Sequence, residues 1–325
     1  MKVVLVVGAT GQQGYAVIHA LAESNEYLCL ALTRNPNSPK AQQLTSFRNV
    51  KLVSADLNDI QQLRSIFKNA RSSTTGEIWG VFVALAFPGL GVSADGEQKQ
   101  GKVGVSGPVV HLLICYTPLM DNNPPPPGLD RHCKMVLEKH ISNLNFPWTG
   151  LRIIRPGAFM ENLNPGIIGR MTMQHFSIAF RSNLATRLQA VDDIGRLARV
   201  VFDNPTKFEH KTIDIAGDSL TPKELNQAFI RATGHEMPSI PWILISTMRR
   251  ISPAVHDIIE EFIQADRMRR MDPRGFDANL QEAASYLKLT SFEEWARNWN
   301  DPPDKGAKQH GITLWGLFMG NTTYT

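Results

Sequence analysis

Residues 2–14, KVVLVVGATGQQG, decide the fold. Lys2 is followed by five aliphatic residues, a run typical of a strand buried on both faces of a parallel sheet. Three glycines follow at the spacing G-x-x-G-x-x-G, and Tyr15, Val17 and Leu21 then recur at helical spacing. Such a turn lets the backbone approach a pyrophosphate, to which the helix N-terminus presents free N–H groups. The pattern predicts a dinucleotide-binding turn, and a plain strand–helix connection is the alternative.

The same alternation of strand and helix continues along the chain. Further strands are expected at 27–33, 50–53, 79–86, 109–116 and 151–155, with helices between most of them. Strands and helices in this order predict right-handed crossovers and an α/β fold, a doubly wound, mostly parallel Rossmann sheet.

The sequence divides into three predicted regions. A Rossmann domain is expected over 1–156, and the strand at 211–216 returns to it. A smaller, mainly helical substrate or cap region is expected over 157–300, interlocked at the C-terminal side, and 301–325 form a tail without predicted structure. Within 157–300, Thr221 and Ser291 each start a capping box.

Composition excludes several classes of protein. The chain has 325 residues, 42% of them hydrophobic and 20% charged, and a net charge of +4, which is too weak for direct nucleic-acid binding. Cys29, Cys115 and Cys133 form no CxxC pair and favour a reducing, cytoplasmic location. The histidines show no metal-binding spacing, so no metal is expected. No stretch approaches the roughly eighteen apolar residues that span a membrane.

The end of the second strand indicates which dinucleotide binds. An NAD site places an acid there for the ribose 2′-hydroxyl, whereas a 2′-phosphate requires a basic side chain. This sequence has Thr33-Arg34-Asn35-Pro36 and no acid, which favours NADP(H); Arg34 as a solvated surface residue is the alternative. Asp56 ends the third strand and either borders the adenine or starts the next helix.

Several motifs together carry a family resemblance. GATGQQG, TRNP, ADLND, EQKQGK, RPGAFMENL, DIG and IDIAGDSLTPKE occur in this order, and the likeness covers roughly 1–102 and 129–235. The chain resembles the NmrA-like family of atypical short-chain dehydrogenases, and most of all its fungal oxidoreductases of secondary metabolism. The resemblance implies a Rossmann fold, NADP(H) as cofactor and a small organic molecule as substrate.

The resemblance also implies the roles of individual residues. It implies that the phosphates are bound by the glycine turn, namely Gly8, Ala9, Thr10, Gly11, Gln12, Gln13 and Gly14. By this resemblance, the adenosine phosphate is bound by Arg34, Asn35, Pro36, Asn37 and Ser38, and the adenine is bordered by Asp56 and Leu57. By the same resemblance, the residues near the nicotinamide and its ribose are Leu85, Ala86, Phe87, Lys134, Phe159, Met160, Glu161 and Asn162. Lys99, in EQKQGK, is a further cofactor-binding residue.

One segment departs from the family pattern. VGVSG (103–107) stands where the family has a helix, and Tyr116-Thr117-Pro118 replaces its small-hydroxyl strand end. The four prolines at 124–127 have no counterpart and bar regular structure, so 117–128 are expected to form an exposed loop. A shifted reading frame, a retained non-coding segment and genuine divergence each explain such an island.

The catalytic prediction is Lys134. Ordinary short-chain dehydrogenases use Tyr-x-x-x-Lys, and none of the five tyrosines here has lysine four residues later. Lys134 near the start of a helix from Asp130 could itself donate the proton, or it could merely pair with Glu138. The alternative function is a catalytically inactive sensor that binds NADP(H) and passes its state to a regulatory protein partner.

Overall fold

In the computed structural model, the longest described stretches lie at the start of the chain and in its C-terminal half. The described residues are 1–72, 76–85, 99, 111–115, 136, 139–140, 151–164, 169, 185–238, 243, 250, 270–271 and 280–299. They belong to two compact units. The first unit comprises Met1–Phe87, Ala94–Pro156 and Val191–Asp214, and the second comprises Pro88–Ser93, Gly157–Ala190 and Ile215–Thr325.

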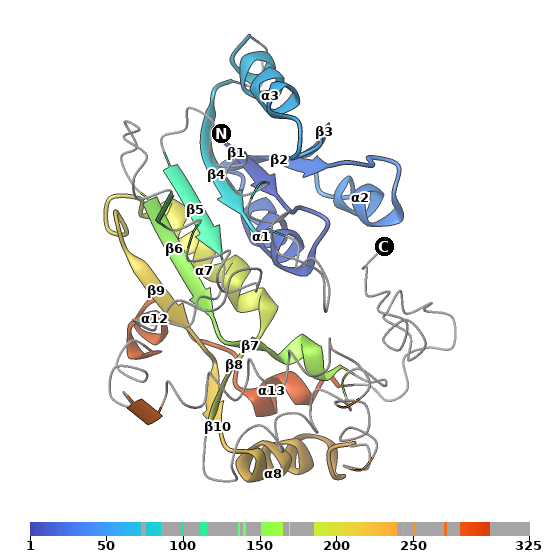
Figure 1. The fold of residues 1–325 in the computed structure, drawn as a ribbon, viewed down its shortest axis with the longest axis vertical. Helices are drawn as coiled ribbons and strands as arrows, with labels where there is room; N and C mark the ends of the chain where they lie inside the picture. Colours follow the sequence, from blue (N-terminus) through green and yellow to red (C-terminus); the bar gives the residue numbers. More distant parts are fainter. Residues whose placement is uncertain are drawn as a thin grey trace. The chain divides into compact units, whose positions relative to one another are not determined.

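The first unit is built on a seven-stranded sheet in the order β3-β2-β1-β4-β5-β6-β9 (Figure 1). The hydrogen bonds Ile153 N to Lys211 O and Gly157 N to Ile215 O advance together, so β9 is parallel to β6. The doubly wound parallel sheet is therefore confirmed. Its strands are β1 (Lys2–Val7), β2 (Tyr27–Thr33), β3 (Val50–Ser54), β4 (Ile78–Val83), β5 (His111–Cys115), β6 (Leu151–Pro156) and β9 (Thr212–Ile215).

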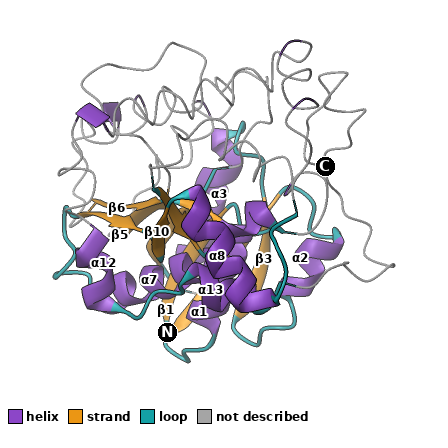
Figure 2. Cartoon of the chain, turned by 90° about the horizontal axis from the view of Figure 1, so that it is seen from below, coloured by secondary structure: helices purple, strands orange, loops and turns teal. Residues whose placement is uncertain are grey.

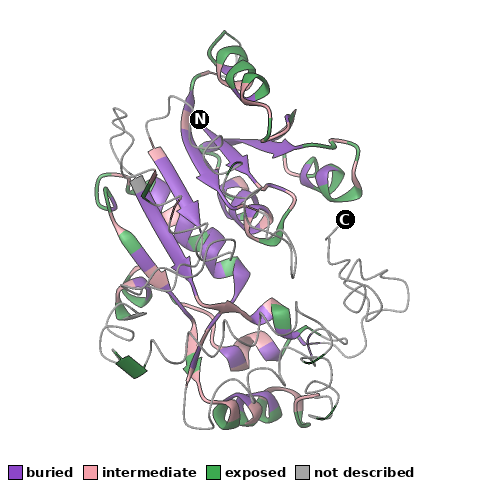
Figure 3. Ribbon diagram, in the orientation of Figure 1, coloured by how far each residue is buried: buried purple, intermediate pink, exposed green. Residues whose placement is uncertain are grey.

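Helices cover both faces of this sheet. Among the described residues of this unit, the helices with given bounds are α1 (Gln12–Ala22), α2 (Pro39–Leu44), α3 (Ile60–Ser72) and α7 (Val191–Asp203). Leu5 of β1 shares a core cluster with Leu63 of α3. On the other face, the ring of Tyr27 lies 6.4 Å from that of Phe202 in α7. Figure 2 shows α3 on one side of the strands and α1 with α7 on the other. Both β1 and β2 are buried along almost their whole length (Figure 3), as their aliphatic sequences predict.

The start of α3 follows the predicted signal. The Oδ1 atom of Asp59 accepts from Gln61 N at 2.9 Å and from Gln62 N at 3.3 Å, so Asp59 caps the helix as expected. These two bonds hold the pKa of the Asp59 carboxyl below its usual value, because they stabilise the carboxylate.

Helix α7 belongs to the first unit, although the predicted substrate region, 157–300, includes it. Its buried stripe, which includes Ile194 and Leu197, packs along α1. Gly195 allows the close approach: an added Cβ atom would lie 2.2 Å from the carbonyl oxygen of Ala16. The Tyr27 hydroxyl also donates to Asp203 at the end of α7, over 2.6 Å.

The second unit contains a small three-stranded sheet in the order β10-β8-β7. The elements of this unit that the structure describes with bounds are β7 (Ala158–Phe159), the 3-10 helix η1 (Met160–Leu163), β8 (Thr186–Gln189), β10 (Asp218–Leu220), α8 (Pro222–Thr233), α12 (Leu280–Tyr286) and α13 (Phe292–Ala296). Both predicted capping boxes are confirmed, at Thr221 before α8 and at Ser291 before α13. Helix α8 ends at Gly234, whose φ of 83° suits a left-handed cap.

Several expectations lie outside the described residues, namely those on 117–128, Asp130, Lys134, Cys133 and the tail at 301–325. Where the structure is described, Cys29 and Cys115 are buried free thiols. Within the same ranges there is no helix of the length and apolar character that crossing a membrane requires.

Candidate functional site

The loops that carry most predicted site residues leave the same edge of the sheet. Strands β1 to β4 are parallel, so their carboxyl ends lie together. Strand β1 sits between β2 and β4, and the chain changes direction across the sheet at this point. Ligands of open α/β sheets bind at such a switch point, outside the carboxyl ends of the strands.

Two glycines of the turn after β1 are required by its own packing. Gly8 has a φ of 81°, and an added Cβ atom would lie 2.0 Å from the carbonyl oxygen of Ala84, next to β4. At Gly14 an added Cβ atom would lie 2.2 Å from Gly8 O. Side chains at these two positions would break the turn, whatever it binds.

Gly11 is different, because it is exposed and its surroundings are open. An added Cβ atom there would have one neighbour within 4 Å, Gly8 O at 3.3 Å. Gly11 is also the N-cap of α1, where no side chain caps the helix, so the first-turn N–H groups can face a ligand. The Oε1 atom of Gln13, in the same turn, is buried without a hydrogen-bond partner. A glycine-lined, uncapped helix start of this kind fits phosphate groups.

The turn after β2 holds its shape through side chains that bond to the backbone. The Thr33 hydroxyl accepts from Asn35 N at 3.2 Å, and Asn35 Oδ1 accepts from Asn37 N at 3.1 Å. Ser38 caps α2 by accepting from Ala41 N. Sequence reasoning missed the role of Thr33, which the hydroxyl at a strand end could have suggested.

Arg34 lies in this ordered turn with its side chain exposed. In the part of the chain that the structure describes, Arg34 makes no ion pair and no side-chain hydrogen bond. The side chains of its neighbours Thr33 and Asn35, in contrast, accept hydrogen bonds from the backbone of the turn. A guanidinium held in this way at the end of β2 fits a 2′-phosphate, since it can offer a pair of N–H donors to it. Pro36 supports the turn as well, because its carbonyl accepts from Gln42 Nε2 at 2.8 Å.

In the turn after β3, Asp56 forms hydrogen bonds within the turn and with α3. Asp56 Oδ1 accepts from Asn58 N at 2.8 Å and from Asn58 Nδ2 at 2.9 Å, and Asp56 N donates to Gln62 Oε1. Asp56 therefore shapes the approach to α3, and its contact with an adenine remains a prediction. Leu57 and Leu85 are partly buried against the core cluster that contains α3.

Of the remaining predicted site residues, some are described by the structure and others are not. Lys99 is exposed and helical, and Ala86, Phe87 and Lys134 lie outside the described residues. In the second unit, Phe159 and Glu161 are half-buried and Asn162 is exposed. The side chain of Met160 is fully buried in the core cluster of this unit with Leu163, so it packs there rather than facing solvent.

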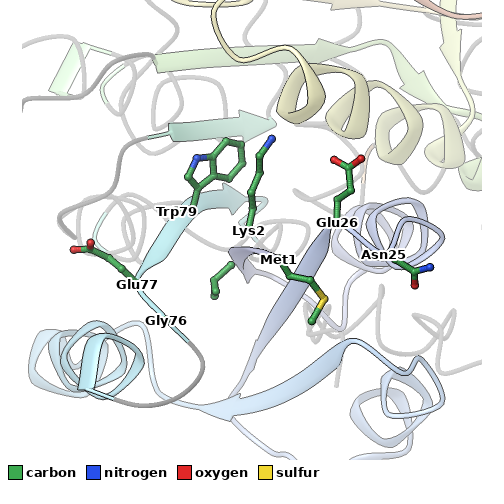
Figure 4. A pocket seen from close by; sticks show the side chains of 8 residues that line it. Met1, Lys2, Asn25, Glu26, Gly76, Glu77 and Trp79 are labelled. Carbon is green, nitrogen blue, oxygen red and sulfur yellow. The ribbon is translucent and has the colours of Figure 1, made fainter.

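A separate hollow of about 580 Å³ opens at the amino ends of the strands (Figure 4). Residues that precede or begin β1, β2 and β4 line it, among them Lys2, Glu26 and Trp79. Lys2 Nζ lies 4.6 Å from the centre of the Trp79 ring, and His111 packs behind that ring. Burial, and then Arg152 and Lys2, lower the pKa of His111 to about 4, so the imidazole is neutral near pH 7. The hollow lies at the sheet edge opposite the glycine turn.

Comparison with known proteins agrees with this architecture. An NmrA-like family domain-containing protein of Dictyostelium discoideum is 25% identical over 92% of this chain and 98% of its own length. An NmrA-like family domain-containing oxidoreductase of Aspergillus japonicus is 22% identical over 92% of this chain and 93% of its own.

Solved structures of NmrA, a negative transcriptional regulator, share the fold. The complex of NmrA with NADP has a TM-score of 0.66 at 19% identity and covers 91% of this chain and 94% of the other, and a complex with NAD superposes as well, with a TM-score of 0.67. The profile of the NmrA-like family matches residues 1–76 and 131–296, and so leaves out the segment in which the departures at 103–107 and 124–127 occur. The chain belongs to the NmrA-like family.

Proposed function

We propose that this chain is an NADP(H)-dependent oxidoreductase that reduces a small organic intermediate of secondary metabolism. The observation that carries the proposal is the ordered turn after β2, which leaves the Arg34 side chain exposed beside an uncapped glycine turn. Several relatives in the family are named oxidoreductases, including the one from Aspergillus japonicus. That NmrA binds NADP as well as NAD supports a nicotinamide dinucleotide as the cofactor.

Each part of the described site has a defined task in this proposal. The first-turn N–H groups of α1 bind the pyrophosphate, and Gly11 leaves room for it. Arg34 pairs with the 2′-phosphate. NADPH, when bound, supplies the hydride, and Lys134 is proposed to donate the proton to the substrate. A lysine can do so near neutral pH if burial lowers its pKa.

We expect Arg34→Ala to remove the preference for NADPH. Wild-type protein should bind NADPH at least about tenfold more tightly than NADH, roughly 1.4 kcal/mol, a typical contribution of one charge-assisted phosphate contact. Titration of both nucleotides against both proteins measures this. Arg48→Ala is the matched control, because Arg48 is also exposed but precedes β3, at the other edge of the sheet. Equal affinities of the wild type for the two nucleotides would refute NADP specificity.

Lys134→Met tests the proposed acid. We expect the variant to stay folded and to lose at least about 100-fold in NADPH turnover, the usual contribution of a general acid. Lys139→Met serves as control, since Lys139 is an exposed lysine nearby in sequence. Stopped-flow absorbance of NADPH with a panel of ketones, enones and imines gives the readout. Unchanged turnover in Lys134→Met would mean that this lysine is a surface charge.

A second candidate function is a sensor that binds NADP(H) without turning it over. The missing Tyr-x-x-x-Lys motif favours it, and NmrA is itself a negative transcriptional regulator. The two candidates differ in one measurement. If NADPH binds but no substrate class is reduced, and if a protein partner is captured only in the presence of NADP(H), the sensor explains the site better than the enzyme does.

A further inference from the structure

The buried hydroxyl of Thr33 forms two hydrogen bonds that span Arg34. Thr33 is the last residue of β2 and is 8% exposed. Its Oγ1 atom accepts from Asn35 N at 3.2 Å and donates to Asn35 O at 3.3 Å. Because both bonds run to the backbone of the residue after Arg34, Thr33 shapes the turn from inside rather than facing a bound nucleotide.

The same residue ties the turn to the sheet. Thr33 lies opposite Ser54 in the parallel register of β2 and β3, and its carbonyl oxygen accepts from Ala55 N at 3.2 Å. A threonine side chain is branched at Cβ, so few rotamers are open to it. The hydroxyl is therefore fixed relative to the sheet, and it fixes the backbone on both sides of Arg34.

Helix α2 holds the other end of the turn. Gln42 is exposed on this helix, and its Nε2 donates to the carbonyl oxygen of Pro36 over 2.8 Å. The backbone adds a further bond, from Ser38 N to Asn35 O at 3.2 Å. The turn is thus held by the strand before it and by the helix after it, and the exposed side chain of Arg34 leaves it between these two supports.

Such a turn affects one nucleotide more than the other. A guanidinium binds phosphate through N–H donors in a fixed planar arrangement, so its affinity depends on the direction in which the backbone points it. A backbone that is ordered before binding also loses less conformational entropy when the ligand arrives. NADH has no 2′-phosphate and gains nothing from either effect. The two supports of the turn should therefore raise the affinity for NADPH and leave that for NADH unchanged.

We propose that Thr33 and Gln42 are positioning residues for nucleotide specificity: they hold Arg34 where its guanidinium meets the 2′-phosphate of NADP(H). The inference rests on the proposed function, since it requires that Arg34 bind this phosphate. It adds that the preference for NADPH depends on two residues whose own side chains bond to the protein backbone and not to the phosphate.

The first test removes each support in turn. Thr33→Val keeps the shape of the side chain and removes the hydroxyl, so the affinity for NADPH should fall about three- to tenfold, the effect of one hydrogen bond, while that for NADH stays the same. Thr33→Ser restores the hydroxyl and should recover most of the preference. Gln42→Met should lower the preference in the same direction, and its exposed position keeps the test open if Thr33→Val fails to fold.

The second test separates positioning from a general structural role. In an Arg34→Ala background there is no guanidinium to position, so adding Thr33→Val should change neither affinity further. A Thr33 that only stabilised the turn would lower the affinities to the same extent with and without Arg34. Thr45→Val is the matched control, because its hydroxyl also bonds to the backbone, donating to Gln42 O over 2.7 Å, but at the far end of α2. It should keep the wild-type preference.

The outcomes distinguish the two levels of the argument. If both variants lower the preference for NADPH and the effect of Thr33→Val disappears without Arg34, the proposal stands. If both keep the preference, or if Thr33→Val weakens NADPH and NADH binding alike, the positioning role is overturned while the proposed function survives. If the wild type does not distinguish the nucleotides, or if Arg34→Ala leaves the preference intact, NADP specificity itself is refuted.

Discussion

Gly11→Val is expected to abolish NADPH binding and to leave the protein folded. The backbone of Gly11 is extended, with a φ of −82°, a conformation that valine adopts without strain. The nearest atom to an added Cβ is Gly8 O at 3.3 Å, so this oxygen must shift by only a few tenths of an ångström, and the valine side chain then fills the space that the pyrophosphate needs. We expect at least about a 100-fold loss of affinity, roughly 2.7 kcal/mol, measured by NADPH fluorescence.

Gly14→Val is the control that separates binding from folding. Its Cβ would lie 2.2 Å from Gly8 O, a backbone atom, so the turn and the start of α1 must shift. This variant should therefore lose both nucleotide affinity and thermal stability, whereas Gly11→Val should keep its circular dichroism spectrum and melting temperature. Wild-type affinity in Gly11→Val would show that the glycines only make a turn.

Gly195→Ala should destabilise the protein, although the same change in most helices is favourable. Alanine is preferred over glycine in a helix by roughly 1 kcal/mol. Here the added Cβ would lie 2.2 Å from Ala16 O, so α1 and α7 must move apart. Overpacking of this kind costs about 1–3 kcal/mol or more, and we expect a net loss of roughly 2 kcal/mol, with a melting temperature lower by about 4–8 °C.

The control for this prediction is Asp192→Ala, at an exposed position in the first turn of the same helix. It removes a favourable charge at the helix N-terminus and should cost less than about 1 kcal/mol. Thermal unfolding in the absence of nucleotide compares the two variants. If Gly195→Ala raises the melting temperature, helix propensity outweighs the contact, and α7 does not lie as close to α1 as the structure has it.

Much of the first unit could be predicted because its signals are local. Aliphatic strands, glycines and capping residues such as Asp59 each act within a few neighbours in sequence. The position of α7 could not be predicted in the same way. An apolar stripe shows that a helix is buried, but not against which element, and the partner of Gly195 is Ala16, far away in the chain. Strand β10 has the sequence DSL, which is too short and too polar to indicate a strand.

The sequence predicts the motifs of the candidate site, but it does not show which residue of a motif binds the ligand and which one the packing requires. The spacing of three glycines does not reveal that Gly8 and Gly14 are needed for packing while Gly11 faces open space. Lys134 lies outside the described residues, so its place as the acid rests on the family resemblance.

The return of α7 and β9 to the first unit makes that unit discontinuous along the chain, with consequences during synthesis. A ribosome that has released residues 1–156 has delivered six of the seven strands, yet the side of α1 that faces α7 is still uncovered. Translation must pass through 157–190, which belong to the other unit, before Val191–Asp203 can cover it. The nascent chain therefore carries an apolar helix face for longer than a contiguous domain would, which exposes it to aggregation and to chaperones.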